Sequence, residues 1–97
     1  MSPAHTLRIA EATVTLIRKL HPHLKRKIRA ALNKIVHDPT RGKPLKLELA
    51  GLRSYGVGRL RIIYRIDLEK MVELVAVGPR KMIYEETYRL VAIKIFE

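Results

Sequence analysis

The pattern of apolar positions in the first half of the chain predicts two consecutive helices. Over 22–37, apolar residues repeat from Leu24 at i, i+4, i+7, i+8, i+11 and i+12, which marks one face of a helix. The apolar residues over 11–20 also follow a helical spacing. Pro22 separates the two segments, because proline disfavours helical geometry in the residue before it and suits the first turn of a helix. The pattern therefore predicts a helical hairpin.

After residue 44 the pattern changes to a period of two, which is typical of strands. Three successive strands with short turns between them are predicted over 53–57, 59–66 and 72–77. Strands joined by such short connections pair antiparallel, so this part is predicted to be a meander. A weaker alternation over 4–10 predicts a short N-terminal strand. The segment 45–49 also alternates, and it forms either a paired strand or an extended connector.

The end of the chain returns to a helical pattern. Gly78-Pro79 ends the last predicted strand, and a short closing helix is predicted over 81–91. Its inward-facing residues would be Ile83, Leu90 and Thr87. The final stretch, 91–97, alternates again, so it is either a last strand or an extension of that helix.

The predicted strand over 59–66 has one apolar and one cationic side, because successive side chains of a strand point to opposite faces. The apolar side carries Leu60, Ile62, Tyr64 and Ile66. The other side carries Arg59, Arg61, Ile63 and Arg65. We therefore predict an α+β fold: an antiparallel sheet of three to four strands, with an N-terminal strand and the helical hairpin packed on one face. The opposite face would present Arg53, Arg59, Arg61 and Arg80.

Composition adds a domain count and a strong charge. A chain of 97 residues with 47% hydrophobic residues forms one small domain, 1–97, around a single core. Twenty Lys and Arg against nine Asp and Glu give a net charge of +11. Such a charge predicts a polyanionic partner, and nucleic acid, an anionic membrane surface and an acidic protein all satisfy it.

Several kinds of chemistry are excluded by what the sequence lacks. It has no Cys, which rules out a disulfide scaffold, a thiolate nucleophile and cysteine-based metal sites. Its four His are not at metal-ligand spacing, its two Ser are not in a nucleophile-elbow context, and no glycine-rich phosphate loop opens a helix. No segment has the length of a membrane span. We therefore predict a cytoplasmic protein without a metal, a small-molecule cofactor or a membrane partner.

Arginine is the side chain with chemical potential here, since guanidinium groups bind phosphate oxygens in pairs and stay protonated. Arg59, Arg61, Arg65 and Arg80 could bind a nucleic-acid backbone or stabilise a phosphorane, or they could be the solvated side of a half-buried sheet. The basic cluster on the second helix, which includes Lys25 and Arg26, is interpreted as a solvated face that speeds encounters with RNA or DNA.

Four segments follow one another in a recognisable order. They are Asp38-Pro39 with Gly42-Lys43-Pro44-Leu45, Leu49-x-Gly51-Leu52-Arg53-Ser54-Tyr55, Val57-Gly58-Arg59-Leu60-Arg61-Ile62-Ile63-Tyr64, and Val77-Gly78-Pro79-Arg80-Lys81-x-x-Tyr84. Together with the helical hairpin, this succession resembles the RelE/ParE superfamily of toxins from type II toxin–antitoxin pairs, over nearly the whole chain. The resemblance implies a β-α-α-β-β-β core with a microbial-ribonuclease-like fold.

RelE-like members cut mRNA on the ribosome through attack of a ribose 2′-hydroxyl on the adjacent phosphate. The resemblance implies that Arg61 and Arg80 stabilise the phosphorane and that Tyr84 transfers a proton or stacks on a base. The residues expected to contact RNA around them are Arg53, Tyr55, Arg59, Lys81, Lys25 and Arg26. The implied partners are the ribosome with its mRNA and an acidic antitoxin, which would wrap the domain as an extended strand and a helix.

The resemblance leaves the general base open. RelE enzymes carry lysines on the strand before Arg61, whereas 53–58 contains none. Arg53 and Tyr55 are the alternatives for part of that role, although arginine is a poor base, and Lys81 could supply a cation. ParE-like members share the scaffold but inhibit DNA gyrase by binding it, and the missing lysines favour that alternative. A third alternative is a binding module without catalysis.

Overall fold

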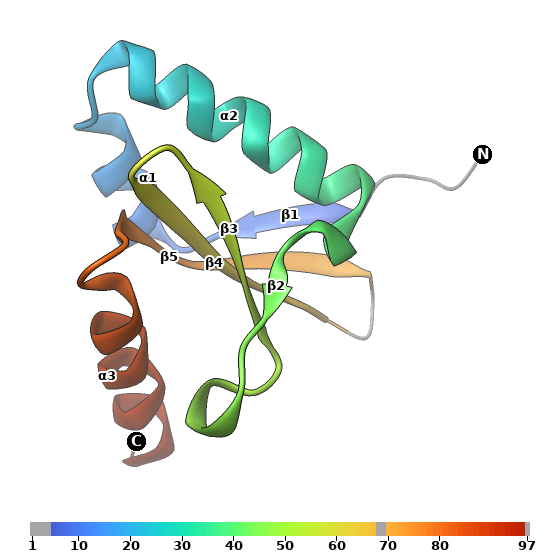
Figure 1. Cartoon of the computed structure of the whole chain (residues 1–97), viewed down its shortest axis with the longest axis vertical. Helices are drawn as coiled ribbons and strands as arrows, with labels where there is room; N and C mark the ends of the chain where they lie inside the picture. The colour runs from blue at the N-terminus through green and yellow to red at the C-terminus, as the bar shows by residue number, and fades with distance from the viewer. Residues whose placement is uncertain (1–4, 68–69, 97) are drawn as a thin grey trace.

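A five-stranded sheet in the order β1-β5-β4-β3-β2 organises the chain (Figure 1). The computed structural model describes residues 5–67 and 70–96. The strands are β1 (Thr6–Ile9), β2 (Lys43–Pro44), β3 (Leu52–Val57), β4 (Leu60–Ile66) and β5 (Met71–Pro79). The helices are α1 (Glu11–Arg18), α2 (Pro22–His37) and α3 (Ile83–Phe96), with two short 3₁₀ turns, η1 (Pro39–Arg41) and η2 (Leu47–Leu49).

The predicted helical hairpin and meander are confirmed. α2 has the predicted bounds, and His21 caps it, because its ring Nδ1 accepts a hydrogen bond from the backbone N–H of His23 at 3.1 Å. β3, β4 and β5 pair antiparallel in succession. Of the two alternatives for the segment 45–49, the connector is correct, because Leu47 adopts a left-handed φ of 55° and is 84% exposed. The strand paired with β3 is Lys43–Pro44 instead.

The N-terminal strand changes the type of sheet. β1 lies beside β5 and runs parallel to it, so the sheet is mixed and not wholly antiparallel as the pattern predicted. The reason lies in the path of the chain: the helical hairpin carries it across the sheet before β3 begins, and the meander then returns to β1. The predicted strand also included Ala4, which lies outside the described residues.

The main core lies between the sheet and α2, on the face we call the α2 face. Ile28, Leu32 and Ile35 from one side of α2 are buried against Ile62 and Leu74 of the two central strands. Tyr64 is fully buried in the same layer. The helical spacing of these apolar residues thus becomes the face that packs, which removes roughly 1.5–3 kcal/mol of unfavourable hydration for each buried large side chain.

The opposite face, the α3 face, carries a second and smaller core. Leu52, Ile63 and Ala76 of the sheet are buried under Ile83 of α3. The face that was expected to present arginines is thus covered by α3 where Ile83 packs on the sheet. On this face Arg61 and Arg65 of β4 lie on either side of Ile63.

The closing helix is confirmed, and it continues to Phe96 instead of giving way to a strand. Ile83 and Thr87 are buried as expected, and the Thr87 hydroxyl donates to the carbonyl of Ile83 at 2.7 Å. Leu90 was also expected to face inward, but it is 45% exposed. Among the described residues, only the first turns of α3 supply buried side chains. The helical spacing is correct for Ile83 and Thr87, but one turn later the helix no longer lies over the sheet.

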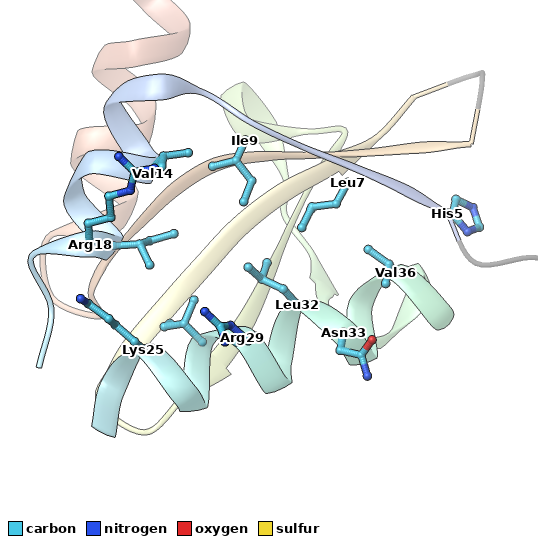
Figure 2. A pocket seen from close by; sticks show the side chains of 12 residues that line it. His5, Leu7, Ile9, Val14, Arg18, Lys25, Arg29, Leu32, Asn33 and Val36 are labelled. Carbon is cyan, nitrogen blue, oxygen red and sulfur yellow. The ribbon is translucent and has the colours of Figure 1, made fainter. Parts of the chain in front are cut away.

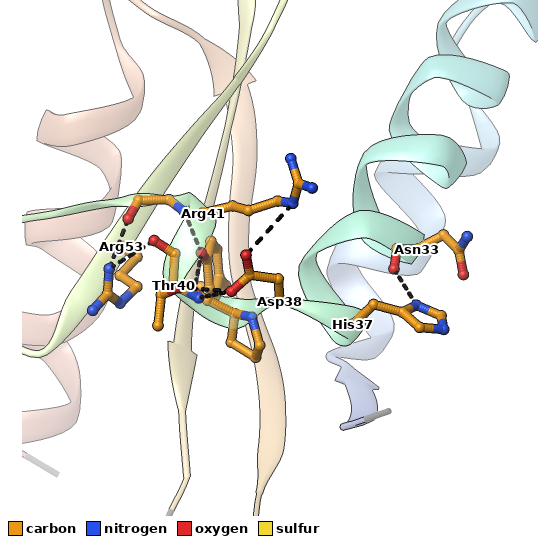
Figure 3. A network of polar contacts seen from close by, with 9 residues as sticks. Asn33, His37, Asp38, Thr40, Arg41 and Arg53 are labelled. Atoms are coloured by element: carbon orange, nitrogen blue, oxygen red, sulfur yellow. Dashed lines mark hydrogen bonds and ion pairs between the residues drawn. The ribbon is translucent and has the colours of Figure 1, made fainter. Parts of the chain in front are cut away.

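A polar network fixes the loop between α2 and β2. The buried Tyr64 hydroxyl donates to the carbonyl of Pro39 at 2.6 Å and accepts from the backbone N–H of Gly42 at 2.8 Å. Arg53 donates from Nη1 to the carbonyl of Gly42 at 2.8 Å (Figure 3). A β-carbon on Gly42 would stand only 2.4 Å from the Tyr64 hydroxyl oxygen, so this approach requires glycine.

Candidate functional site

Arg61 stands between two glycines on the α3 face. It is paired with Gly56 across β3 and with Gly78 across β5, and directly opposed residues of antiparallel strands share a face. A β-carbon on Gly56 would lie 3.0 Å from Nη1 of Arg61, so the guanidinium lies over the bare backbone of β3. The half-buried arginine therefore has its stem supported by the sheet and its planar donors free for an anion.

Three further cations gather at the same end of the sheet. Arg59 lies in the β3–β4 turn, and its carbonyl accepts a hydrogen bond from the backbone N–H of Arg80 at 3.1 Å. Arg80 and Lys81 follow β5, and all three side chains are exposed. The structure thus brings Arg59, Arg80 and Lys81 together with Arg61, and we call these four residues the cationic end.

Tyr84 reaches the sheet from the first turn of α3. Its hydroxyl lies 3.2 Å from Oγ of Ser54, and either oxygen could be the donor. Ser54 is 3% exposed and sits on β3 one alternation from Gly56, on the same face as Arg61. Sequence reasoning missed Ser54. The signal that could have found it is the register, which places positions 54 and 56 of β3 on the face of Arg61.

A carboxylate lies next to Gly78, the residue of β5 that is paired with Arg61. Oε2 of Glu86, in the first turn of α3, is 3.7 Å from the point where a β-carbon of Gly78 would stand. Glu86 is exposed and was not singled out from the sequence. The α3 face at this end of the sheet therefore combines guanidinium groups, a tyrosine hydroxyl and a carboxylate, which are donors for a phosphate and groups that can hold or release a proton.

Arg53 and Tyr55 lie on the other face. The two-residue turn at Gly58-Arg59 opposes Val57 to Leu60, so odd-numbered residues of β3 share a face with even-numbered residues of β4. Arg53 is therefore opposite Tyr64, on the α2 face, and it donates to carbonyls of the loop that follows α2. The expectation that Arg53 shares a face with Arg61 is wrong for this reason.

The basic residues of the second helix are also remote from the cationic end. Lys25 and Arg26 belong to α2, which packs on the α2 face of the sheet, whereas Arg61 is on the α3 face. Lys25 is half-buried and Arg26 is exposed. The structure does not bring these two residues together with Arg61, Arg80 and Tyr84.

Within the described residues, the site offers no cluster for a metal ion: no three His, Asp or Glu side chains come together there. Over the same part of the chain, no helix has the length and apolar character needed to cross a membrane.

The fold and the site define a class: a small basic α+β domain with a mixed sheet whose cations gather at one end. Residues 7–88 match the profile of the ParE-like toxins of type II bacterial toxin–antitoxin systems. The match spans most of the chain, so this protein belongs to that family and is a type II toxin of the RelE/ParE superfamily. Among curated proteins, none matches this sequence.

Solved structures support the same assignment. A chain of the toxin–antitoxin complex RelBE2 from Mycobacterium tuberculosis is 32% identical, with a TM-score of 0.71 over 79% of this chain and 92% of that chain. The free state of an arginine-to-alanine variant of Escherichia coli toxin RelE gives a TM-score of 0.76 at 18% identity, covering 96% and 99% of the two chains. The archaeal RelE–RelB complex from Pyrococcus horikoshii gives 0.68 at 20% identity, covering 80% and 97%. The last two show a shared fold.

Proposed function

We propose that this toxin is a ribosome-dependent mRNA endonuclease that acts in the cytoplasm and cuts by attack of a 2′-hydroxyl on the adjacent phosphate. The observation that carries the proposal is the position of Arg61, between two glycines and near Arg59 and Arg80. Arg61 also shares a face with Ser54, which contacts Tyr84. A phosphorane gains negative charge as it forms, and guanidinium groups held in place before the reaction stabilise that charge. Gly56 lets the Arg61 guanidinium lie against the backbone of β3, which holds it in place before a phosphate arrives.

The proton transfers can be assigned to two side chains of α3. Tyr84 would supply the proton to the leaving 5′-oxygen, with its hydroxyl positioned by Ser54 at 3.2 Å. Glu86 would accept the proton of the 2′-hydroxyl, and this carboxylate replaces the lysines that the strand before Arg61 lacks. Arg61 and Arg80 would hold the phosphate between these two groups. RNA contacts by Arg59 and Lys81 extend the same surface, because both lie at the cationic end.

The test is cleavage on programmed ribosomes, with new mRNA ends mapped by primer extension. We expect cuts within A-site codons for the wild type, none above background for Arg61→Ala, and a loss of about 10²–10⁴-fold for Glu86→Gln, the usual range for a general base. Glu85→Gln is the matched control, because Glu85 precedes Glu86 on α3 and forms an exposed ion pair with Arg89. Full activity of Glu86→Gln would remove this residue from the mechanism without affecting the role of Arg61.

A second function, inhibition of DNA gyrase by binding, is favoured by one observation. The β3 residues that share the face of Arg61 are Leu52, Ser54 and Gly56, so the strand supplies neither a base nor a further cation there. Under this alternative the cationic end would be a protein-binding surface. Ribosomes that yield no cuts, together with loss of supercoiling activity when the toxin is added to gyrase, would establish it.

A further inference from the structure

Lys43 brings a further cation to the α3 face, from the short edge strand β2. It is paired with Ser54 of β3, and directly opposed residues of antiparallel strands share a face. The alternation of the chain gives the same placement, because Leu45, two residues further on, packs against the second core on that face. Ser54 in turn contacts the hydroxyl of Tyr84 at 3.2 Å. The lysine is therefore a direct neighbour of the residue that positions this tyrosine.

The side chain of Lys43 is also close to the guanidinium of Arg61. That guanidinium lies over Gly56, which is two residues along β3 from Ser54. Lys43 and Gly56 are thus diagonal neighbours on one face of an antiparallel pair. The Cα atoms of such neighbours are about 7–8 Å apart, a distance that long side chains span. An anion bound by Arg61 therefore lies within the reach of Lys43.

The ammonium of Lys43 has no anionic partner in the protein. The residue is exposed, and within the described part of the chain it forms no ion pair. Arg65, on the same face, differs in this respect because Glu73 binds it at 2.8 Å. A lysine ammonium is a compact charge on a flexible stem, which suits a single contact with a phosphate oxygen. Lys43 thus has a free charge where a phosphate can approach it.

We propose that Lys43 binds the RNA phosphate next to the one held by Arg61, on the β2 side of the site. The cations then form a line across the strands, from Arg80 after β5, past Arg61 on β4, to Lys43 on β2. A single-stranded backbone carries one phosphate per nucleotide, and a basic groove tracks it with separate cations. The inference rests on the proposed function and adds a neighbouring phosphate subsite to it.

Binding of an mRNA that cannot be cut tests this subsite. Programmed ribosomes would carry an mRNA with 2′-deoxyribose in the A-site codon, and one flanking phosphate at a time would be replaced by a neutral methylphosphonate. For the wild type, we expect one such replacement to lower the affinity of the toxin about tenfold. Lys43→Met should show about the same loss with the unmodified phosphates and less than a twofold further loss on that replacement, because the contact is already absent.

Lys25→Met is the matched control, because it removes the same charge from the other face. Lys25 and Arg29 lie at one end of an apolar groove of about 570 Å³ between β1, α1 and α2 (Figure 2). This groove belongs to the α2 face, whereas Arg61 and Lys43 are on the α3 face. Lys25→Met should therefore keep the tenfold sensitivity to the same methylphosphonate.

A wild-type sensitivity in Lys43→Met would overturn the proposal and leave this lysine as a charge that protects the sheet edge from pairing. A wild-type toxin without affinity for these ribosomes would overturn it as well. Cleavage of ordinary mRNA is scored separately. Cuts together with an unchanged Lys43→Met profile would retain the endonuclease and reject the subsite, whereas binding that depends on Lys43 without cuts would retain the subsite and reject the endonuclease.

Discussion

Arg61 is the residue on which the proposed chemistry depends, and its position requires a neighbour without a side chain. Gly56 opposes it on β3, so its guanidinium can lie over the sheet instead of being pushed into solvent. An arginine held in this way has lost much of its rotamer freedom before an anion arrives. Stabilisation of a developing charge is strongest for donors positioned in advance.

Arg61→Ala is expected to lower the cleavage rate by about 10²–10³-fold, as for the loss of one oxyanion donor. Arg65→Ala is the matched control, since Arg65 is on the same strand and face but is bound to Glu73 at 2.8 Å. Loss of that partly exposed pair costs at most about 1 kcal/mol of stability. Single-turnover cleavage and a thermal melt measure both effects, and equal loss of activity in the two variants would contradict the assignment.

The Tyr64 hydroxyl has a structural role, because it holds the loop between α2 and β2. Tyr64→Phe leaves the carbonyl of Pro39 and the N–H of Gly42 without their partner, which is expected to cost about 1–3 kcal/mol in the free energy of unfolding. Tyr88→Phe is the control, because that side chain is 49% exposed. Urea unfolding measures both variants. A midpoint unchanged in Tyr64→Phe would show that the loop is held by other contacts.

Tyr64 also makes the free energy of unfolding depend on pH in the alkaline range. Burial raises the pKa of Tyr64 above its ordinary value of 10.0. The folded protein then retains the proton more tightly than the unfolded chain, so this contribution is complete below pH 10 and is lost as the pH rises through the raised pKa. Between pH 9 and 11, the free energy of unfolding should fall more steeply for the wild type than for Tyr64→Phe. Parallel curves would be inconsistent with a buried neutral phenol.

At the scale of elements, local signals in the sequence were sufficient for some features and not for others. Proline at the start of α2 and the apolar spacing that follows fix that helix without help from the rest of the chain. The partner of β1 could not be predicted in this way. Its parallel pairing with β5 depends on where the helical hairpin places the meander relative to β1. Tertiary context of this kind is absent from any short window of sequence.

Asp38 links two elements, and its titration provides a test. Its carboxylate accepts hydrogen bonds from the hydroxyl of Thr40 at 2.6 Å and from the N–H of Thr40 at 3.3 Å, after α2 ends and as η1 begins (Figure 3). The hydroxyl hydrogen bond is the main reason that the pKa of Asp38 lies below its usual 3.8. This stabilisation is present above pH about 4 and is lost as the pH falls through the lowered pKa.

Asp38→Asn is therefore expected to flatten the fall in melting temperature below pH 4. Glu48→Gln, at an exposed position of η2, is the control and should keep the acid limb of the wild type. Melting curves between pH 2.5 and 6 make the comparison. Identical acid limbs for Asp38→Asn and the wild type would mean that the carboxylate of Asp38 does not support the junction between α2 and η1.

At the scale of the whole molecule, the net charge of +11 is divided between two faces. The cationic end lies on the α3 face, whereas Lys25 and Arg29 lie beside the groove on the α2 face. The sequence could identify Arg61, Arg80 and Tyr84 as a group, because a motif orders them along the chain. It could not separate Arg53 from Arg61, since the length of one turn decides which strand residues share a face.

This division predicts how salt affects binding to RNA. Each phosphate contact that a cation makes adds about one unit to the slope of log affinity against log salt concentration. Arg80→Ala should reduce the slope by about one, whereas Lys34→Ala, an exposed position of α2, should leave it unchanged. Filter binding to ribosomal RNA from 50 to 300 mM salt measures the slopes. An equal reduction in both variants would show that RNA binding does not distinguish the two faces.

The most direct test of RNA cleavage by the α3 face is to map mRNA ends in cells in which the toxin is induced. We predict new 5′ ends within translated codons in the wild type, the same ends with Arg65→Ala, and none with Arg61→Ala. Growth arrest with intact mRNA and relaxed plasmid DNA would contradict the account and assign the cationic end to gyrase.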